Sequence, residues 1–161
     1  MDFLAHGVSE GWLNPFGRFV RDHPALRLVP DLPLRAIITD SLYITEPDVA
    51  ELLQAKAAIA GGVQTLLELA GLRPEDLRAL YVAGGFGYHL NAAHALAIGL
   101  FPAIPRERIH LVGNSSLGGA SLLLYPEFRS AIEPLLACVN VVELNQIPSF
   151  EDNFTDALAF P

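Results

Sequence analysis

Residues 80–87 of this chain read LYVAGGFG, and they decide its fold class. The mostly apolar residues 77–83 are typical of a buried strand, and three glycines follow within the next four positions. In an α/β fold, ligands bind beyond the carboxyl ends of strands, where glycine lets a ligand approach the main chain. Two interpretations follow: a tight turn into the next helix, or a bare stretch of backbone against which a ligand rests.

A second unit of strand, glycine turn and helix follows further along the chain. Residues 109–112 are strand-like, Gly113 ends them, and a helix rich in small and apolar residues follows over 115–124. Between the two strands, Asn91 is a candidate N-cap for a helix to Ala97 that Gly99 ends. A helical crossover makes the two strands adjacent and parallel, with their carboxyl ends at one edge. The pattern predicts an α/β fold.

The longest predicted helix begins at Thr45, which is its N-cap, and runs to Gly71. Its Gly61-Gly62 pair marks either a weak point or a point of close packing. The remaining expectations are a helix over 2–10, antiparallel strands over 26–30 and 34–44, a helix over 126–137, a strand over 139–144, and a last helix to Leu158 capped by residues 149–152. No linker divides residues 1–161, so we expect one domain. Its first helix starts without an N-cap, which indicates truncation at the N-terminus.

Composition excludes several classes of function. The 161 residues are 52% hydrophobic and 17% charged, with a net charge of -8, which predicts one soluble domain without a nucleic-acid groove. The single cysteine, Cys138, excludes an internal disulfide and a cysteine-ligated cluster. It suits a cytoplasmic location, and we expect it in the core. Residues 1–5 carry no basic side chain and no apolar run reaches membrane-spanning length, so we expect neither a signal peptide nor a membrane-spanning segment.

Neither glycine turn matches a common ligand-binding or catalytic motif. Counted from Gly85, a dinucleotide fingerprint would place Leu90 where it needs its third glycine. The second turn has Gly119 where a P-loop needs lysine, and Asn114 where a nucleophile elbow needs glycine. His89 and His94 are five apart, which is not helical metal-ligand spacing. We therefore predict no metal ligands and no catalytic residues, and a stand-alone hydrolase is disfavoured.

Four segments resemble a known family, the ATP-dependent reductive activators of corrinoid proteins, in their C-terminal ASKHA-type region. These segments are ITEPDV at 44–49, QAKAAI at 54–59, YVAGGFG at 81–87 and VGNS at 112–115. The closing pattern from Phe150 and Phe154 to Phe160-Pro161 also matches. The resemblance covers nearly the whole chain, and the matching segments occur in the same order as in the family. It implies an RNase-H-like or actin-like ATPase lobe: a mixed sheet with an antiparallel N-terminal hairpin and parallel strands flanked by helices.

The resemblance also implies a nucleotide site. Its glycine turn is similar to the adenosine motif of the acetate kinase, Hsp70 and actin superfamily. Gly84, Gly85 and Gly87 would let the main chain lie against adenine and ribose, with Phe86 lining that side. The other implied contacts are Gln54 and Lys56, on the long helix, and Asn114 and Ser115, at the end of the neighbouring strand. From the sequence alone, Lys56 is either a solvated lysine or one whose ammonium reaches the nucleotide.

Several parts that the family carries have no counterpart in these residues. The [2Fe-2S] cluster of the family belongs to a ferredoxin-like domain, and the first ASKHA subdomain holds a phosphate loop and the catalytic acid. The resemblance therefore implies ATP and magnesium as cofactors and a corrinoid protein as partner, but predicts a lobe that is inactive alone. The alternative is a non-catalytic interaction module that docks a corrinoid protein or forms a homodimer.

Overall fold

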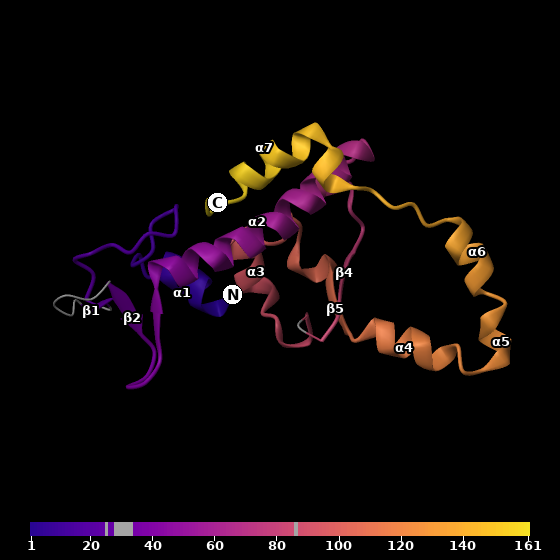
Figure 1. Cartoon of the computed structure of the whole chain (residues 1–161), viewed down its shortest axis with the longest axis horizontal. Coiled ribbons are helices and arrows are strands. Elements are labelled where there is room, and N and C mark those ends of the chain that lie inside the picture. The colour runs from indigo at the N-terminus through magenta and orange to yellow at the C-terminus, as the bar shows by residue number, and fades with distance from the viewer. Residues whose placement is uncertain (25, 28–33, 86) are drawn as a thin grey trace.

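The computed structural model describes residues 1–24, 26–27, 34–85 and 87–161. One long helix, α2 (Glu46–Leu69), organises them, as Figure 1 shows. Helix α7 (Pro148–Asp156) runs along one side of it, while α1 (Asp2–Ser9) and α3 (Ala92–Ala97) lie on the other. No helix of these described ranges is both long enough and apolar enough to cross a membrane.

The N-terminal strands form a small antiparallel sheet in the order β1 (Leu26–Arg27), β2 (Arg35–Ile37), β3 (Tyr43–Thr45). The prediction of a single strand over 34–44 is wrong, because the chain reverses between β2 and β3. The Thr39 hydroxyl accepts a hydrogen bond from the Leu42 amide at 3.1 Å, which fixes a turn around polar residues. The part of the first predicted strand beyond Arg27 lies outside the described residues.

Helix α2 begins where the sequence predicts. Thr45 and Asp48 form a capping box, in which the Thr45 amide donates to the Asp48 carboxylate at 2.8 Å. The helix continues unbroken through Gly61 and Gly62. A Cβ at Gly61 would lie 2.9 Å from the backbone nitrogen of Phe154 in α7, so this pair is a point of close packing and not a weak point.

Strands β4 (Leu80–Ala83) and β5 (Ile109–Gly113) pair in parallel, and α3 lies between them in sequence. The predicted adjacency is therefore confirmed, as is the Asn91 cap, whose side chain accepts from the amide of Ala93 at 3.0 Å. The structure is an α/β fold with an antiparallel hairpin and parallel strands flanked by helices. Among the described residues, the antiparallel and parallel strands belong to two separate sheets.

The segment after β5 differs most from expectation. Three helices follow, α4 (Ser115–Leu122), α5 (Pro126–Arg129) and α6 (Ile132–Ala137), and they extend away from α2 (Figure 1). The predicted helix over 126–137 is divided, because Pro134 has no amide hydrogen and fits only the first turn of a new helix.

Three smaller expectations about this C-terminal segment are also wrong. Residues 139–143 form no strand, because no described strand lies beside them. Cys138 is exposed and not in the core, since it ends α6 on the projecting segment. The N-cap of α7 is Ile147, followed by Pro148 and without a side-chain cap, so residues 149–152 already lie within the helix.

The hydrophobic core lies between α1, the turn after it, the antiparallel sheet, α2 and α3. Trp12 is central to it, with its ring 4.8 Å from that of Phe3 and 6.2 Å from that of Phe19. The C-terminal Phe160 closes this core, and its amide donates to the Pro15 carbonyl at 2.8 Å. The most deeply buried apolar members are Leu4, Val49, Ala95, Ile98 and Leu100.

Candidate functional site

The glycine turn after β4 exposes bare backbone. Gly84 has φ of 108°, in the left-handed region that favours glycine. Its amide donates to the carbonyl of Gly113 at 2.7 Å, which holds the ends of β4 and β5 together. Among the described residues, no atom lies within 4 Å of a Cβ built on Gly84 or Gly85. The surface above these two residues is therefore open to a ligand, while Phe86 lies outside the described residues.

Gly87 differs from the other two glycines of the turn. It is buried, and a Cβ there would lie 3.0 Å from the Val82 side chain. Glycine at this position lets the chain fold back against β4. Its observed role is thus packing beneath the turn.

Asn114 and Ser115 lie beside the open glycines, at the carboxyl end of β5. The Asn114 side chain accepts from the amide of Leu117 at 3.0 Å and caps α4, of which Ser115 is the first residue. The N-terminus of a helix carries unpaired amides and a partial positive charge. The structure therefore brings Gly84, Gly85, Asn114 and Ser115 to one sheet edge, with a helix N-terminus that favours anions.

Lys56 has a different environment from the one expected of a solvated lysine. Its side chain is only 1% exposed, so that interpretation is wrong. The ammonium donates to the Ala159 carbonyl at 2.6 Å and lies 5.5 Å from the centre of the Phe160 ring. Burial lowers the pKa of Lys56. The observed contacts fix the C-terminal segment, and contact with a nucleotide stays a prediction.

Gln54 lies in a different cavity from the glycine turn. It is exposed on α2 and lines a groove of about 620 Å³ between α2 and α7. Phe16 and Phe154 provide aromatic walls of this groove, and Thr155 adds a hydroxyl. The structure does not bring Gln54 and the glycine turn together in this cavity, and its predicted contact with a nucleoside stays a prediction.

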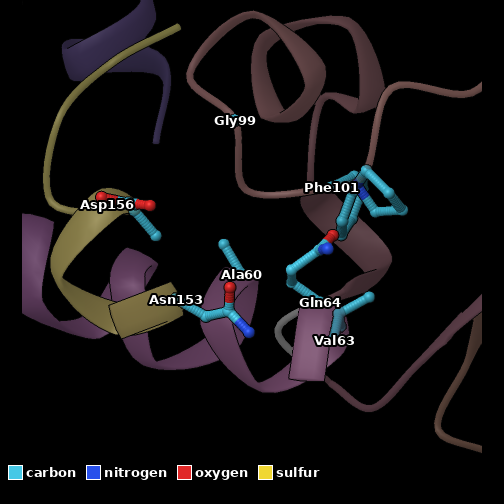
Figure 2. Close-up of a pocket in the computed structure, with 9 residues that line it drawn as sticks. Ala60, Val63, Gln64, Gly99, Phe101, Asn153 and Asp156 are labelled. Carbon is cyan, nitrogen blue, oxygen red and sulfur yellow. The ribbon is translucent and has the colours of Figure 1, made fainter. Parts of the chain in front are cut away.

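A pocket of about 350 Å³, lined mainly by apolar residues and by three polar side chains, lies between α2, α7 and the loop containing Gly99 and Phe101 (Figure 2). Asn153 donates from its amide nitrogen to Thr65 at 3.1 Å and to Glu68 at 3.0 Å. Gln64 donates to the other carboxylate oxygen of Glu68 at 2.9 Å, and these hydrogen bonds, that of Gln64 first, lower the pKa of Glu68. The donors are thus used within the protein. Sequence reasoning did not find this pocket, because no motif marks its residues.

The described residues contain no group of three or more histidine, cysteine, aspartate or glutamate side chains that could hold a metal ion. His94 is paired instead with Asp2, whose carboxylate oxygen lies 2.7 Å from its Nδ1 and ties α3 to α1.

Comparison with known proteins gives one consistent family. Two curated relatives are similar: the corrinoid activation enzyme RamQ of Eubacterium limosum, 32% identical over 70% of this chain, and a [Co(II) methylated amine-specific corrinoid protein] reductase of Methanosarcina barkeri, 33% identical over 62%. The chain spans 19% and 18% of their lengths. It therefore corresponds to about a fifth of each relative.

A solved structure, a reductive activator for a corrinoid, iron-sulfur protein, matches 99% of this chain with a TM-score of 0.88 and 32% identity. The match covers 27% of that protein. Residues 1–161 also match, over their whole length, the family described as the C-terminal domain of RACo, the ASKHA domain. The chain therefore belongs to the family of RACo C-terminal ASKHA domains.

Proposed function

We propose that this chain is the nucleotide-binding lobe of a protein that reductively activates corrinoid proteins, and that it is inactive alone. The observation that carries the proposal is the open backbone at Gly84 and Gly85, beside the capped N-terminus of α4. Adenine and ribose would lie against the glycines, and the phosphates of ATP, with magnesium, would lie toward Asn114 and Ser115. Gln54 and Lys56 have no described contact with this turn, and the proposal does not depend on them.

The role in corrinoid activation is supported by the names of the relatives. In such a protein, ATP hydrolysis would drive an electron from a [2Fe-2S] cluster to a cobalt(II) corrinoid. With Cys138 as its single cysteine, this chain cannot hold that cluster. We therefore assign it the binding of nucleotide and a corrinoid protein as partner, and we place it in the cytoplasm, where a free thiol persists.

Gly85→Val tests the nucleotide site. Gly85 does not have a positive φ, and no described residue lies within 4 Å of a Cβ there, so we expect the substitution to leave the fold intact while covering the proposed binding surface. We expect calorimetric titration with MgATP to show binding by the unaltered chain and at least tenfold weaker binding by Gly85→Val. Gly119→Val is the matched control, because Gly119 also has nothing within 4 Å and lies further along α4.

Equal affinities of the two valine variants would contradict the assignment of this site. The nucleotide hypothesis as a whole is wrong if neither this chain nor a longer polypeptide containing it binds MgATP.

A second candidate function is a non-catalytic interaction module that docks a corrinoid protein or a second copy. The observation that favours it is the apolar surface of α4 to α6, where Leu124 is 74% and Leu135 65% exposed. A chain that remains monomeric by light scattering at high concentration, and that fails to retain a corrinoid protein, would contradict this candidate.

A further inference from the structure

The pocket of Figure 2 combines an apolar wall with three polar side chains. These are Gln64 of α2 and Asn153 and Asp156 of α7. Phe101 adds an aromatic ring to a wall that is otherwise aliphatic. No described residue of the glycine turn, 84–87, lines the pocket, so it is separate from the proposed nucleotide site. Its volume of about 350 Å³ lies within the range of small-molecule sites.

Glu68 fixes the direction of two side-chain amides beside this pocket. The Asn153 nitrogen gives its two hydrogens to the Thr65 hydroxyl at 3.1 Å and to one Glu68 oxygen at 3.0 Å. The Gln64 nitrogen donates to the other Glu68 oxygen at 2.9 Å. Rotating either amide by half a turn would place its carbonyl oxygen against a carboxylate, with no hydrogen between two acceptors. The amide nitrogens are therefore held toward Glu68.

The same hydrogen bonds keep Glu68 in its charged form. The bonds from Gln64 and then from Asn153 lower the pKa of Glu68, so it is ionised at neutral pH. The Thr65 hydroxyl gives its own hydrogen to the Gly61 carbonyl at 2.8 Å, so it can only accept from Asn153. Each partner thus favours a single orientation of the Asn153 amide.

The oxygens that remain give the pocket its chemistry. Figure 2 shows the Asn153 oxygen on the side of Ala60, a lining residue, with the nitrogen turned away from it. Asp156 is exposed, and its carboxylate has neither a hydrogen bond nor an ion pair within the described part of the chain. The lining side chains therefore offer two carbonyl oxygens and a carboxylate, against one unassigned hydrogen on the Gln64 nitrogen. A ligand that fits must be a donor and carry positive charge.

A primary ammonium matches this set of acceptors. It has three donors that diverge and no acceptor, and the oxygens here come from three separate side chains. A guanidinium is suited instead to two acceptors in one plane, such as a single carboxylate. The Phe101 ring and the aliphatic wall can cover an apolar stem, and an aromatic face also attracts a cation.

We propose that this pocket binds a primary alkylammonium group carried on an apolar stem. Asp156 supplies the opposite charge, the oriented oxygens of Asn153 and Gln64 accept hydrogens, and Phe101 contacts the stem. Glu68 does not line the pocket and acts as a positioning residue through the two amides. The group can belong to a free alkylamine or to a lysine side chain of another polypeptide, since both present the same chemistry.

The first test is a titration of this chain with n-pentylammonium chloride at neutral pH and constant ionic strength. The readout is the nuclear magnetic resonance signals of the side-chain amides of Gln64 and Asn153. We expect both signals to shift and to saturate. n-Pentanol has the same stem without the charge, and potassium chloride has a cation without the stem, so neither should reproduce the shifts.

Asp156→Asn and Asp152→Asn form a matched pair of variants. Both carboxylates are exposed on α7 and each change removes one negative charge, but only Asp156 lines the pocket. We expect Asp156→Asn to weaken binding of pentylammonium about fivefold, through the loss of one charge-assisted contact near the surface. Asp152→Asn should retain the affinity of the unaltered chain.

Glu68→Gln tests the orientation of the amides. The variant keeps the size of the side chain but can present a donor to the Asn153 and Gln64 nitrogens, so it no longer fixes their direction. We expect weaker binding than in Asp152→Asn, which loses the same charge. Equal affinities of these two variants would contradict the positioning role of Glu68.

A blocked tripeptide with a central lysine separates the two sources of the ammonium, with a norleucine peptide as its control. Binding of the lysine peptide at least as tight as that of pentylammonium assigns the pocket to a polypeptide partner. Binding of the free amine alone assigns it to a small molecule. The proposal is wrong if neither probe gives a saturable shift, if pentanol or potassium chloride gives equal shifts, or if the two aspartate variants lose affinity equally.

Discussion

At the scale of the residue, Lys56 gives the clearest physical result. Its charge is buried beneath the C-terminal segment, with the Ala159 carbonyl as its hydrogen-bond acceptor and an aromatic face nearby. The contact joins residues 103 apart in sequence, so no local pattern around Lys56 indicates it. The small residues that flank Lys56 fit equally well beside a solvated side chain, and burial follows only when the chain's last residues fold back onto α2.

The burial of Lys56 predicts that the free energy of unfolding depends on pH in the alkaline range. Because burial lowers its pKa in the folded state, the unfolded chain binds more protons at alkaline pH. The free energy of unfolding therefore rises as pH increases from the folded pKa toward the unfolded value of about 10.4. Denaturant titrations at several pH values should show this rise in the unaltered chain relative to Lys56→Met, which has no group to titrate. A difference between the two proteins that stays constant with pH would contradict the prediction.

At the scale of the element, α2 is fixed by two kinds of contact. One joins residues close in sequence, and the other joins α2 to a helix distant in sequence. The Thr45 cap is local, and the sequence predicts it because threonine and aspartate stand at capping-box spacing. The packing of α7 is distant. Thr65 donates to the Gly61 carbonyl at 2.8 Å and accepts from Asn153, so small and polar residues of α2 receive the second helix. The sequence shows only that Gly61 lacks a side chain, and not which element approaches it.

Gly61→Ala and Gly62→Ala should have opposite effects. A methyl group at Gly61 would meet the backbone of Phe154 at 2.9 Å, and we expect a loss of about 1–3 kcal/mol in stability from overpacking. At Gly62 the neighbour is the flexible tip of Leu144 at 3.2 Å, and alanine improves helix propensity by up to about 1 kcal/mol. Thermal denaturation of both variants measures the difference. Equal melting temperatures would show that α7 is not closely packed on α2.

Removal of the cap should destabilise the start of α2. In Thr45→Ala, the amide of Asp48 loses its acceptor, and we expect a loss of about 1 kcal/mol in the free energy of unfolding. Thr45→Ser keeps the hydroxyl and should lose only a fraction of that amount. The Thr45 hydroxyl and amide lower the pKa of Asp48, so the contribution of the box is present at neutral pH and is lost on acidification through that pKa. Urea denaturation of both variants at neutral and acidic pH tests these statements.

At the scale of the whole molecule, sequence-based prediction works where the determining contacts are local. The order of helices and strands, the start of α2, and the adjacency of β4 and β5 follow from caps, glycines and periodicity. It fails in the segment after β5, where apolar patterns over 126–144 indicate one amphipathic helix and a strand. Pro134 divides the helix, and no described strand is available to pair with the rest. Of the predicted site residues, those at the two strand ends lie together, as the sequence predicts. The sequence gives no sign that Gln54 and Lys56 lie apart from them.

The burial of Lys56 has a practical consequence, because it is the only lysine in the chain. Acylating reagents applied to the folded protein should leave the side-chain amine of Lys56 unmodified until the last residues detach from α2. Peptide mapping of the acylated protein would reveal any detachment of the last residues from α2 as modification of Lys56.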